Sequence, residues 1–490
     1  MIKKQNMYKT ILALTLVFLL VFSYASNHYA FGAKPDKTAP TAPTNLRATS
    51  VNETSVTLSW NPSTDNIGVK TYDIYRNNTY LSSSTATSYT AASLTPATTY
   101  QFYVKAKDAK GNISVSSNVI SVTTTATTPL PPPTPVPQPL SNRIVGYYAA
   151  WATYTGTTPD KIDATKLTHI NYAFANIGPD LKITLGYPDI DVNNFKMLNA
   201  LKTTNPNLKT LISVGGWSWS GKFSDAALTD ASRTAFADSC VTFITQYGFD
   251  GVDLDWEYPV SGGLTTNAKR AEDKQNFTLL LKKIREKLDA RGAVDNKHYL
   301  LTIAGGAGGS YANNTELSLI HQYLDYATIM TYDLHGTWDS YTDLHAPLYT
   351  NSDVTPQYKA SVDSSLNAWY QASFPKDKIV VGIPFYGYLY SSVNNANNGL
   401  YQRFSGASSI SYHSIVTNYL NKPGYTRYFH SQSMVPWLFN GTVFISYEDP
   451  QSIGIKTDYI KSKGLGGAMI WELSQDSNKV LLNSVYDGLK

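Results

Sequence analysis

The chain has few cysteines and few charged side chains. Its single cysteine, Cys240, excludes an internal disulfide, so the fold must be stable through its apolar core. Charged residues make up 16% of the chain and the net charge is +4, with no Lys/Arg run that could follow a phosphate backbone. The sequence therefore argues against nucleic acid as a partner.

Long apolar runs are also missing, although aromatic residues are abundant. The only extended apolar stretch, residues 11–22, is shorter than the ~20 residues that a membrane span requires. It follows three Lys residues and precedes small residues, so residues 1–33 are predicted to be a secretory signal peptide. The 36 Tyr and 9 Trp exceed what a core usually needs, and some of these rings are expected to face a ligand.

A Thr/Pro-rich segment divides the chain. Residues 125–140 read TATTPLPPPTPVPQPL, a composition that favours extended polyproline conformation and cannot pack a core. We therefore expect a linker here, between a small module at 38–124 and a large one at 141–490.

The small module has the pattern of an antiparallel β-sandwich. Short alternating runs such as SVTLSW and YQFYVKAKD are separated by turn residues. The module resembles a fibronectin type III domain, and Tyr100 stands where such domains place their tyrosine-corner ring. It shows no cluster of titratable residues, so we interpret it as a spacer or a weak polysaccharide-binding module.

The large module alternates buried strands with amphipathic helices. Apolar residues recur at helical spacing from Phe277 to Leu288, with Gly292 as the expected C-cap, and again from Val362 to Tyr370. Cys240 falls in a similar stripe and is expected to be buried. The α/β class and a parallel (β/α)₈ barrel follow from eight strand candidates: RIVGYYAAW, LTHINYAFANI, TLISVGGW, GVDLDWEYP, YLLTIAGG, YATIMTYDL, IVVGIPFYG and GGAMIWELS.

The connection between the seventh and eighth strands is too long for a simple crossover. Short polar and aromatic runs fill residues 388–444. We expect a small inserted α+β subdomain that forms one wall of a cleft beside the carboxyl ends of the strands.

The fourth strand carries the most informative motif, GFDGVDLDWEYP. Asp253, Asp255 and Glu257 alternate with large apolar residues, so the three carboxyl groups share one face, about 6–7 Å apart along it. Acids pointing into a barrel disfavour one another's ionisation and must share protons, which suits a general acid at Glu257. Asp250 lies at an odd offset and should face away.

Two other interpretations of the three acids compete. A divalent cation could bind them, but Leu254 and Trp256 stand where calcium loops need small polar residues, and no His pair is near in sequence. His169 and His335 are separate from other ligand types. A solvated surface strand is disfavoured by the large apolar residues, and we expect no metal or cofactor.

DGVDLDWE, residues 250–257, resembles the DxxDxDxE signature of glycoside hydrolase family 18. SVGGW at 213–217, MTYD at 330–333, the GIPFYG run and Trp471 also match family segments. The resemblance spans the large module. It implies a chitinase acting on β-1,4-linked N-acetylglucosamine polymers, with a retaining mechanism in which the substrate's own acetamido group is the nucleophile.

The resemblance also implies residue roles. Glu257 would be the acid, Asp255 would turn between Asp253 and Glu257, and Tyr332 would orient the acetamido carbonyl. Trp471 would floor the subsite of the distorted sugar, and Trp151 is a weaker aromatic candidate. The remaining substrate-binding candidates are Trp217, Trp338, Asp333, Tyr147, Ser213, Met330 and Tyr386.

Other functions of the same fold stay open. A related endo-β-N-acetylglucosaminidase or peptidoglycan hydrolase would use the same acids, whereas a non-catalytic lectin usually lacks the acid that Glu257 supplies here. We expect a secreted, extracellular monomer that binds chitin and chito-oligosaccharides and does not bind a membrane after signal cleavage.

Overall fold

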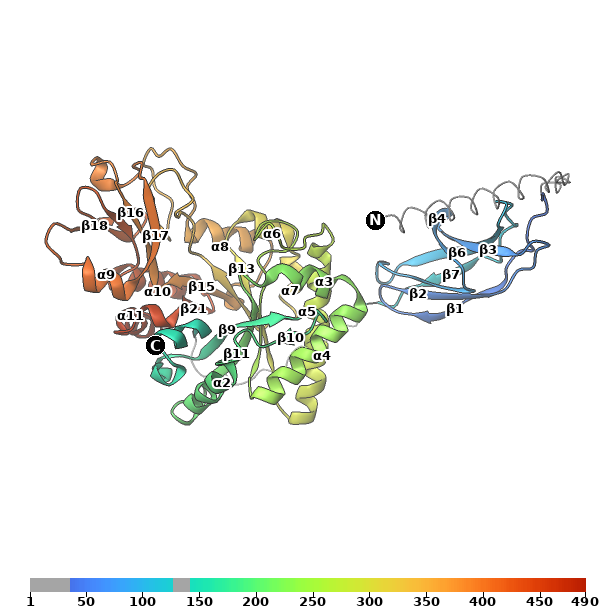
Figure 1. Ribbon diagram of the computed structural model, residues 1–490, viewed down its shortest axis with the longest axis horizontal. Coiled ribbons are helices and arrows are strands. Elements are labelled where there is room, and N and C mark those ends of the chain that lie inside the picture. The colour runs from blue at the N-terminus through green and yellow to red at the C-terminus, as the bar shows by residue number, and fades with distance from the viewer. Residues whose placement is uncertain (1–35, 127–141) are drawn as a thin grey trace, which may run out of the picture. The chain divides into compact units, whose positions relative to one another are not determined.

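The computed structural model describes residues 36–126 and 142–490 and divides the chain into two units, which are treated separately (Figure 1). The predicted signal peptide lies outside the described residues. So does the predicted linker, apart from Thr125 and Ala126. Within the described ranges, no helix is both long and apolar enough to cross a membrane.

The N-terminal unit consists of two antiparallel sheets. One has the order β1-β2-β5 (Thr44–Val51, Val56–Asn61, Ser88–Ala91) and the other β4-β3-β6-β7 (Thr79–Ser84, Val69–Arg76, Thr99–Asp108, Ile120–Thr123). Trp60 and Tyr72 meet edge to face in the core, with ring centroids 5.5 Å apart. The Tyr100 hydroxyl accepts the Thr95 N–H at 2.9 Å, which is the bond expected of a tyrosine corner.

Eight parallel strands form a closed barrel in the C-terminal unit, because β8 pairs with both β21 and β9. This confirms the predicted barrel. Short β10 (Ile183–Thr184) adds an antiparallel hairpin to β9. The barrel strands are β8 (Arg143–Ala149), β9 (His169–Ile177), β11 (Lys209–Gly215), β12 (Gly251–Asp255), β13 (Leu300–Gly306), β14 (Tyr326–Met330), β15 (Ile379–Pro384) and β21 (Gly467–Trp471).

Helices surround the barrel (Figure 1). The longer ones are α2 (Asp191–Ala200), α4 (Asp230–Tyr247), α5 (Asp273–Asp295), α8 (Val362–Gln371), α10 (Pro450–Lys463) and α11 (Val480–Leu489). Short helices are α3 (Phe223–Leu228), α6 (Gly309–Asn314), α7 (Leu317–Ile320) and α9 (Tyr412–Asn418). Cys240 is free and fully buried on α4, as its position in an apolar stripe predicts.

The predicted end of α5 at Gly292 is wrong. The helix continues to Asp295, and Asn296 takes the left-handed conformation at φ 50° and donates its N–H to the Gly292 carbonyl. A glycine is needed at 292 for a different reason, since a Cβ there would lie 2.3 Å from the Lys297 carbonyl oxygen. The close return of the chain, and not a cap, explains this residue.

The insertion between β15 and β21 is an antiparallel sheet of order β17-β16-β20-β19-β18, with α9 between β17 and β18. It forms a separate layer beside the barrel (Figure 1). Its core includes Tyr390, Trp437 and Phe444. The strands are β16 (Tyr386–Ser391), β17 (Gly406–Ser411), β18 (Thr426–His430), β19 (Val435–Phe439) and β20 (Phe444–Ser446).

Candidate active site

Strand β12 divides its side chains between two environments. Val252, Leu254 and Trp256 pack outward with the helices, and Trp256 stacks on Phe223 of α3 at 5.4 Å between centroids. The alternate positions, Asp253 and Asp255, point into the barrel and are 0% and 3% exposed. The alternation of apolar and acidic residues in the sequence therefore corresponds to the outer and inner faces of the strand.

Asp250 lies on the other side, as its offset predicts. It accepts the Thr210 N–H at 2.9 Å and forms ion pairs with Lys202 and Lys297 at 2.7 and 2.8 Å. Burial raises its pKa, but these cations and donors outweigh burial and hold the pKa below its usual range. Asp250 supports the barrel and does not belong to the inner acids.

Asp253 is the most firmly held of the three acids. Its carboxylate accepts hydroxyl donors from Tyr147 at 2.7 Å, Ser213 at 2.8 Å and Thr302 at 2.6 Å. Burial raises the pKa of Asp253, and the three hydroxyl groups offset part of that rise. Tyr147 and Ser213 therefore act on Asp253 in this structure.

Asp255 has the least support. Its Oδ1 is buried and has no hydrogen-bond partner among the described residues. Burial, followed by the charges of Glu257 and Asp253, raises the pKa of Asp255 well above its ordinary value. Because it lies beside two other acids and lacks a partner on Oδ1, this carboxyl group is free to exchange hydrogen-bond partners.

Glu257 follows the end of β12 and is held through its backbone. Its N–H donates to Ser220 Oγ at 2.8 Å, and its carbonyl accepts from Asn267 Nδ2 at 3.0 Å. Burial raises the pKa of Glu257 to about 7, a hydrogen bond from Tyr258 lowers it, and the charge of Asp333 adds to the rise. Glu257 is 8% exposed, so it is nearly dry but reachable.

The paired glycines after β11 allow the backbone to approach this site closely. The Gly216 N–H donates to the Asp255 carbonyl at 2.8 Å. A Cβ at Gly215 would lie 2.4 Å from that carbonyl oxygen, and both glycines have positive φ, 104° and 73°. Only glycine fits here without displacing the acidic strand.

Tyr332 and Asp333 follow β14. The Tyr332 hydroxyl is buried and points to the Met469 sulfur at 3.9 Å, while Asp255 is among the charges that raise its pKa well above the usual value. Met330, at the end of the strand, is partly buried in the same inner cluster. The structure thus brings Tyr332 to the acids, and Met330 packs against the apolar cluster that contains Tyr332.

Asp333 accepts three donors on a single oxygen, Oδ1. They are Tyr386 Oη at 2.5 Å, Tyr388 Oη at 2.7 Å and His345 Nε2 at 2.9 Å. Burial raises the pKa of Asp333, but these donors outweigh it and hold the pKa below its usual range. Tyr386 is 6% exposed, so it contributes its hydroxyl here and not an open ring face.

The predicted aromatic residues differ in exposure. Trp217 and Trp338 are 52% and 61% exposed, and Trp151 is 38% exposed. Trp471 is half-buried, and its ring lies against Tyr147 at 5.5 Å and near Trp151 at 6.4 Å. These rings leave open faces on which a sugar could stack.

Sequence reasoning missed three residues of this site. Tyr258 contacts Glu257 and directly follows it, so adjacency to the motif was an available signal. His345 and Tyr388 contact Asp333 from segments remote in sequence, and nothing local marks them. Their positions depend on the inserted sheet.

His169 and His335 have different surroundings. Thr168 Oγ1 lies 2.8 Å from His169 Nδ1, so the His169 ring has a hydrogen-bond partner, and burial lowers its pKa to about 3. The prediction that His335 is separate from other ligand types is wrong. Its two ring nitrogens lie 3.2 Å from Asp339 and 3.7 Å from Asp343.

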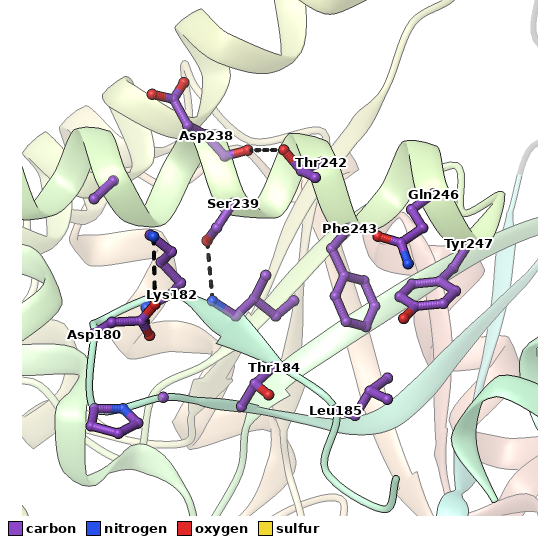
Figure 2. Close-up of a pocket in the computed structure, with 14 residues that line it drawn as sticks. Asp180, Lys182, Thr184, Leu185, Asp238, Ser239, Thr242, Phe243, Gln246 and Tyr247 are labelled. Atoms are coloured by element: carbon purple, nitrogen blue, oxygen red, sulfur yellow. Dashed lines mark hydrogen bonds and ion pairs between the residues drawn. The ribbon is translucent and has the colours of Figure 1, made fainter.

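A cavity of about 810 Å³ lies between α4 and the β10 hairpin, away from the inner acids (Figure 2). Phe243 and Tyr247 of α4 line one side, and Thr184 and Leu185 line the other. None of the inner acids contributes to its lining. We assign no catalytic role to this cavity.

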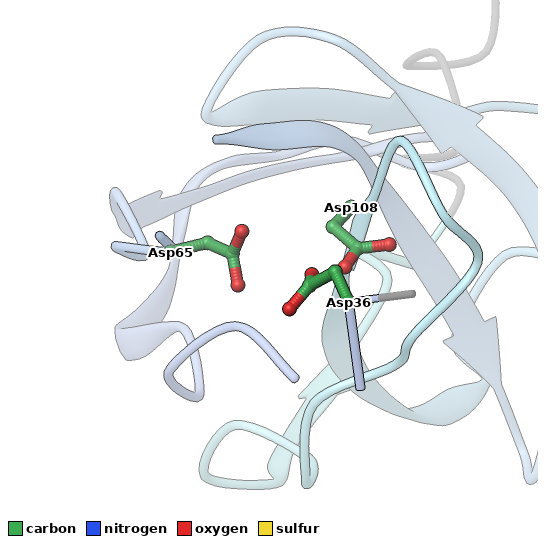
Figure 3. Close-up of side chains that lie close together, drawn as sticks. All are labelled: Asp36, Asp65 and Asp108. Atoms are coloured by element: carbon green, nitrogen blue, oxygen red, sulfur yellow. The ribbon is translucent and has the colours of Figure 1, made fainter. Parts of the chain in front are cut away.

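The N-terminal unit does contain a titratable cluster, contrary to the prediction. Carboxylate oxygens of Asp36, Asp65 and Asp108 lie within 4.8 Å of one another (Figure 3). Asn112 donates to Asp108 Oδ2 at 2.7 Å and also to the Asp36 carbonyl, which holds Asp36 at this loop. The three residues are far apart along the chain, so no local sequence pattern indicates that they lie together.

Comparisons identify relatives of both units. The model for glycosyl hydrolases family 18 matches residues 143–476, and that for the fibronectin type III domain matches 41–123. Chitinase A1 of Niallia circulans is 47% identical over 405 residues, which cover 70% of this chain and 58% of that protein. The chain thus matches less than two thirds of that relative's length.

Two further proteins are similar over longer shares of their own chains. Chitinase C of Streptomyces lividans is 32% identical over 479 residues, covering 90% of this chain and 74% of that protein. The solved structure of a glycoside hydrolase family 18 N-acetylglucosaminidase from Paenibacillus barengoltzii is 41% identical with a TM-score of 0.66. That match covers 71% of this chain and all of the other.

Proposed function

The chain belongs to glycosyl hydrolases family 18, and from this premise we propose that it is a secreted chitinase. It hydrolyses β-1,4 linkages between N-acetylglucosamine units of chitin. The observation that carries the proposal is a nearly dry Glu257 whose pKa lies at about 7, beside Asp255, whose pKa is raised by burial and by the neighbouring acids. Such a group can give up a proton at neutral pH.

Glu257 is the general acid of the proposed reaction. The acetamido carbonyl oxygen of the sugar attacks its own anomeric carbon while the bond to the leaving oxygen breaks and Glu257 protonates that oxygen. The product is an oxazolinium ion and a Glu257 carboxylate. Water then attacks the anomeric carbon, gives its proton to Glu257 and restores both groups, with retention of configuration.

Asp255 and Tyr332 prepare the acetamido group. Asp255 lacks a partner for Oδ1, so it can turn from Asp253 and accept the acetamido N–H while its charge offsets that of the oxazolinium ion. The Tyr332 hydroxyl has only a weak sulfur contact and is available to the acetamido oxygen. Both interactions hold the nucleophile near the anomeric carbon.

Aromatic rings and polar groups bind the rest of the chain. Trp471 stacks on the distorted sugar, and the exposed Trp217 and Trp338 support the leaving-group side. Asp333 offers its solvent-facing oxygen to sugar hydroxyls. The enzyme works as an extracellular monomer after removal of residues 1–33 and needs no cofactor.

A time course on a defined N-acetylglucosamine hexamer, with the anomers resolved, tests the proposal. We expect shorter β-1,4 oligomers whose new reducing ends start as the β-anomer. Release of monomer alone would instead indicate an N-acetylglucosaminidase. Cleavage of glycoprotein glycans or peptidoglycan with an intact hexamer would contradict the proposal.

A further inference from the structure

Asp333 is held in a way that leaves half of its carboxylate unused. All three donors, from His345, Tyr386 and Tyr388, reach Oδ1. The side chain is nevertheless 42% exposed. Oδ2 therefore faces solvent, while Oδ1 is fixed against the inserted sheet.

His345 is the most deeply buried of the three donors and lies at the junction of two parts of the fold. Its side chain is 1% exposed, and its ring packs edge to face against both Tyr386 and Tyr388, at 4.6 and 4.8 Å between centroids. Its backbone N–H donates to Ser446 Oγ of β20 at 2.7 Å. The ring is thus anchored to the inserted sheet.

The hydrogen bonding of His345 defines the ring's proton position. Nδ1 is buried and has no partner among the described residues, whereas Nε2 lies 2.9 Å from Asp333. A buried N–H without an acceptor is costly, so Nδ1 is bare and Nε2 carries the proton. His345 therefore donates through Nε2, and its side-chain partner among the described residues is Asp333 Oδ1.

We propose that His345 is a positioning residue: its Nε2–H fixes Oδ1 of Asp333 to the inserted sheet and so aims Oδ2 at the bound sugar beside Glu257. The inference rests on the proposed function, because it assumes a sugar in this site. In this inference the inserted sheet holds the Asp333 carboxylate next to Glu257.

The groups that face Asp333 explain why this bond matters. Glu257 and Tyr258 face it from the end of β12, Tyr332 from its own segment, and Tyr386 and Tyr388 from β16. None of these five is a cation. His345 lowers the pKa of Asp333 through both its hydrogen bond and its charge, so removal of His345 should let burial raise that pKa.

The test measures hexamer affinity against pH by calorimetry in a Glu257→Gln background, where Glu257 no longer titrates. With His345 intact, affinity should stay flat until the acidic range. Adding His345→Leu should weaken binding severalfold and move the acidic fall of affinity to higher pH by about one unit, the size expected for one hydrogen bond to a charged group. His345→Gln, whose amide can donate near the position of Nε2, should restore most of both properties.

Controls separate the possible failures. His413→Leu, at an exposed residue of α9, should leave the profile unchanged. If His345→Leu does not fold, Tyr388→Phe removes one donor and should shift the profile in the same direction by less. Identical profiles with and without the donors overturn the inference, whereas a Glu257→Gln protein that binds no hexamer contradicts the proposed function itself.

Discussion

The barrel interior and the junction after the insertion both bury carboxyl groups, but they balance them differently. Glu448 and Lys456 form an ion pair in which the side chains are 1% and 0% exposed, and Ser452 donates to Glu448 at 2.6 Å. Asp255 and Glu257 are also buried, at 3% and 8% exposed, but have no cation among the groups that shift their pKa. The paired carboxylate holds structure together, whereas the unpaired acids keep a proton available for chemistry.

The two sites use buried charge for different purposes. Desolvation destabilises both sites, and a facing ammonium group compensates it only at Glu448. At the barrel centre no ammonium group of the described residues faces the acids, so desolvation raises the pKa values of Asp255 and Glu257 instead. Removing a partner at the junction should therefore damage stability, and removing an acid from the centre should damage catalysis.

Glu257→Gln should produce the largest effect. Hydrolysis should fall by about 10²–10⁴-fold, because an amide cannot supply the proton that general acid catalysis needs. Melting temperature should not fall, since the substitution removes a carboxyl group that is costly to ionise in the barrel. Hexamer turnover and thermal unfolding measure the two properties.

Glu286→Gln, at a half-exposed position on α5, is the matched control and should behave as the parent protein in both assays. Full activity of Glu257→Gln would reject the assignment of the acid.

Lys456→Met should show the reverse pattern. It leaves Glu448 buried without its cation and should reduce the free energy of unfolding by about 3–5 kcal/mol. Activity per folded molecule should persist, because neither residue touches the inner acids. Lys461→Met, in an exposed pair with Asp458, should change stability by less than about 0.5 kcal/mol. Equal losses of unfolding free energy in the two lysine variants would show that the buried ion pair contributes no more stability than the exposed one.

The pH profile should report the unpaired acids directly. Glu257 is active when protonated, so kcat/KM should fall as pH rises through about 7. Asp333→Asn removes a negative charge that raises this pKa, so the alkaline limb should move to lower pH by roughly 0.5 unit, the order expected for one charge across partly wet protein. A limb that stays in place or moves upward would show that Asp333 does not act on Glu257 in this way.

The smallest expected effect is that of metal removal. A strong chelator should leave hexamer hydrolysis unchanged, because the proposed reaction uses a carboxylic acid and the substrate's acetamido group. If the chelator abolished hydrolysis and a divalent cation restored it, the reaction would depend on a metal ion and not on the unpaired acids alone.

The local patterns of the sequence were sufficient for the barrel and for its acidic strand. Eight apolar runs predicted the eight strands, and residue alternation placed Val252, Leu254 and Trp256 outside and Asp253 and Asp255 inside. The end of α5 was mispredicted, because Gly292 serves a contact with Lys297 that no local pattern contains.

Period-two alternation and helical periodicity are properties of neighbouring residues, so the amino-acid sequence by itself determined the barrel and the direction of its acids. Only the tertiary structure decided how those acids are supported. The clamp of His345, Tyr386 and Tyr388 on Asp333 and the cluster of Asp36, Asp65 and Asp108 join residues far apart along the chain. Such contacts depend on how separate segments pack, and local periodicity carries no information about that packing.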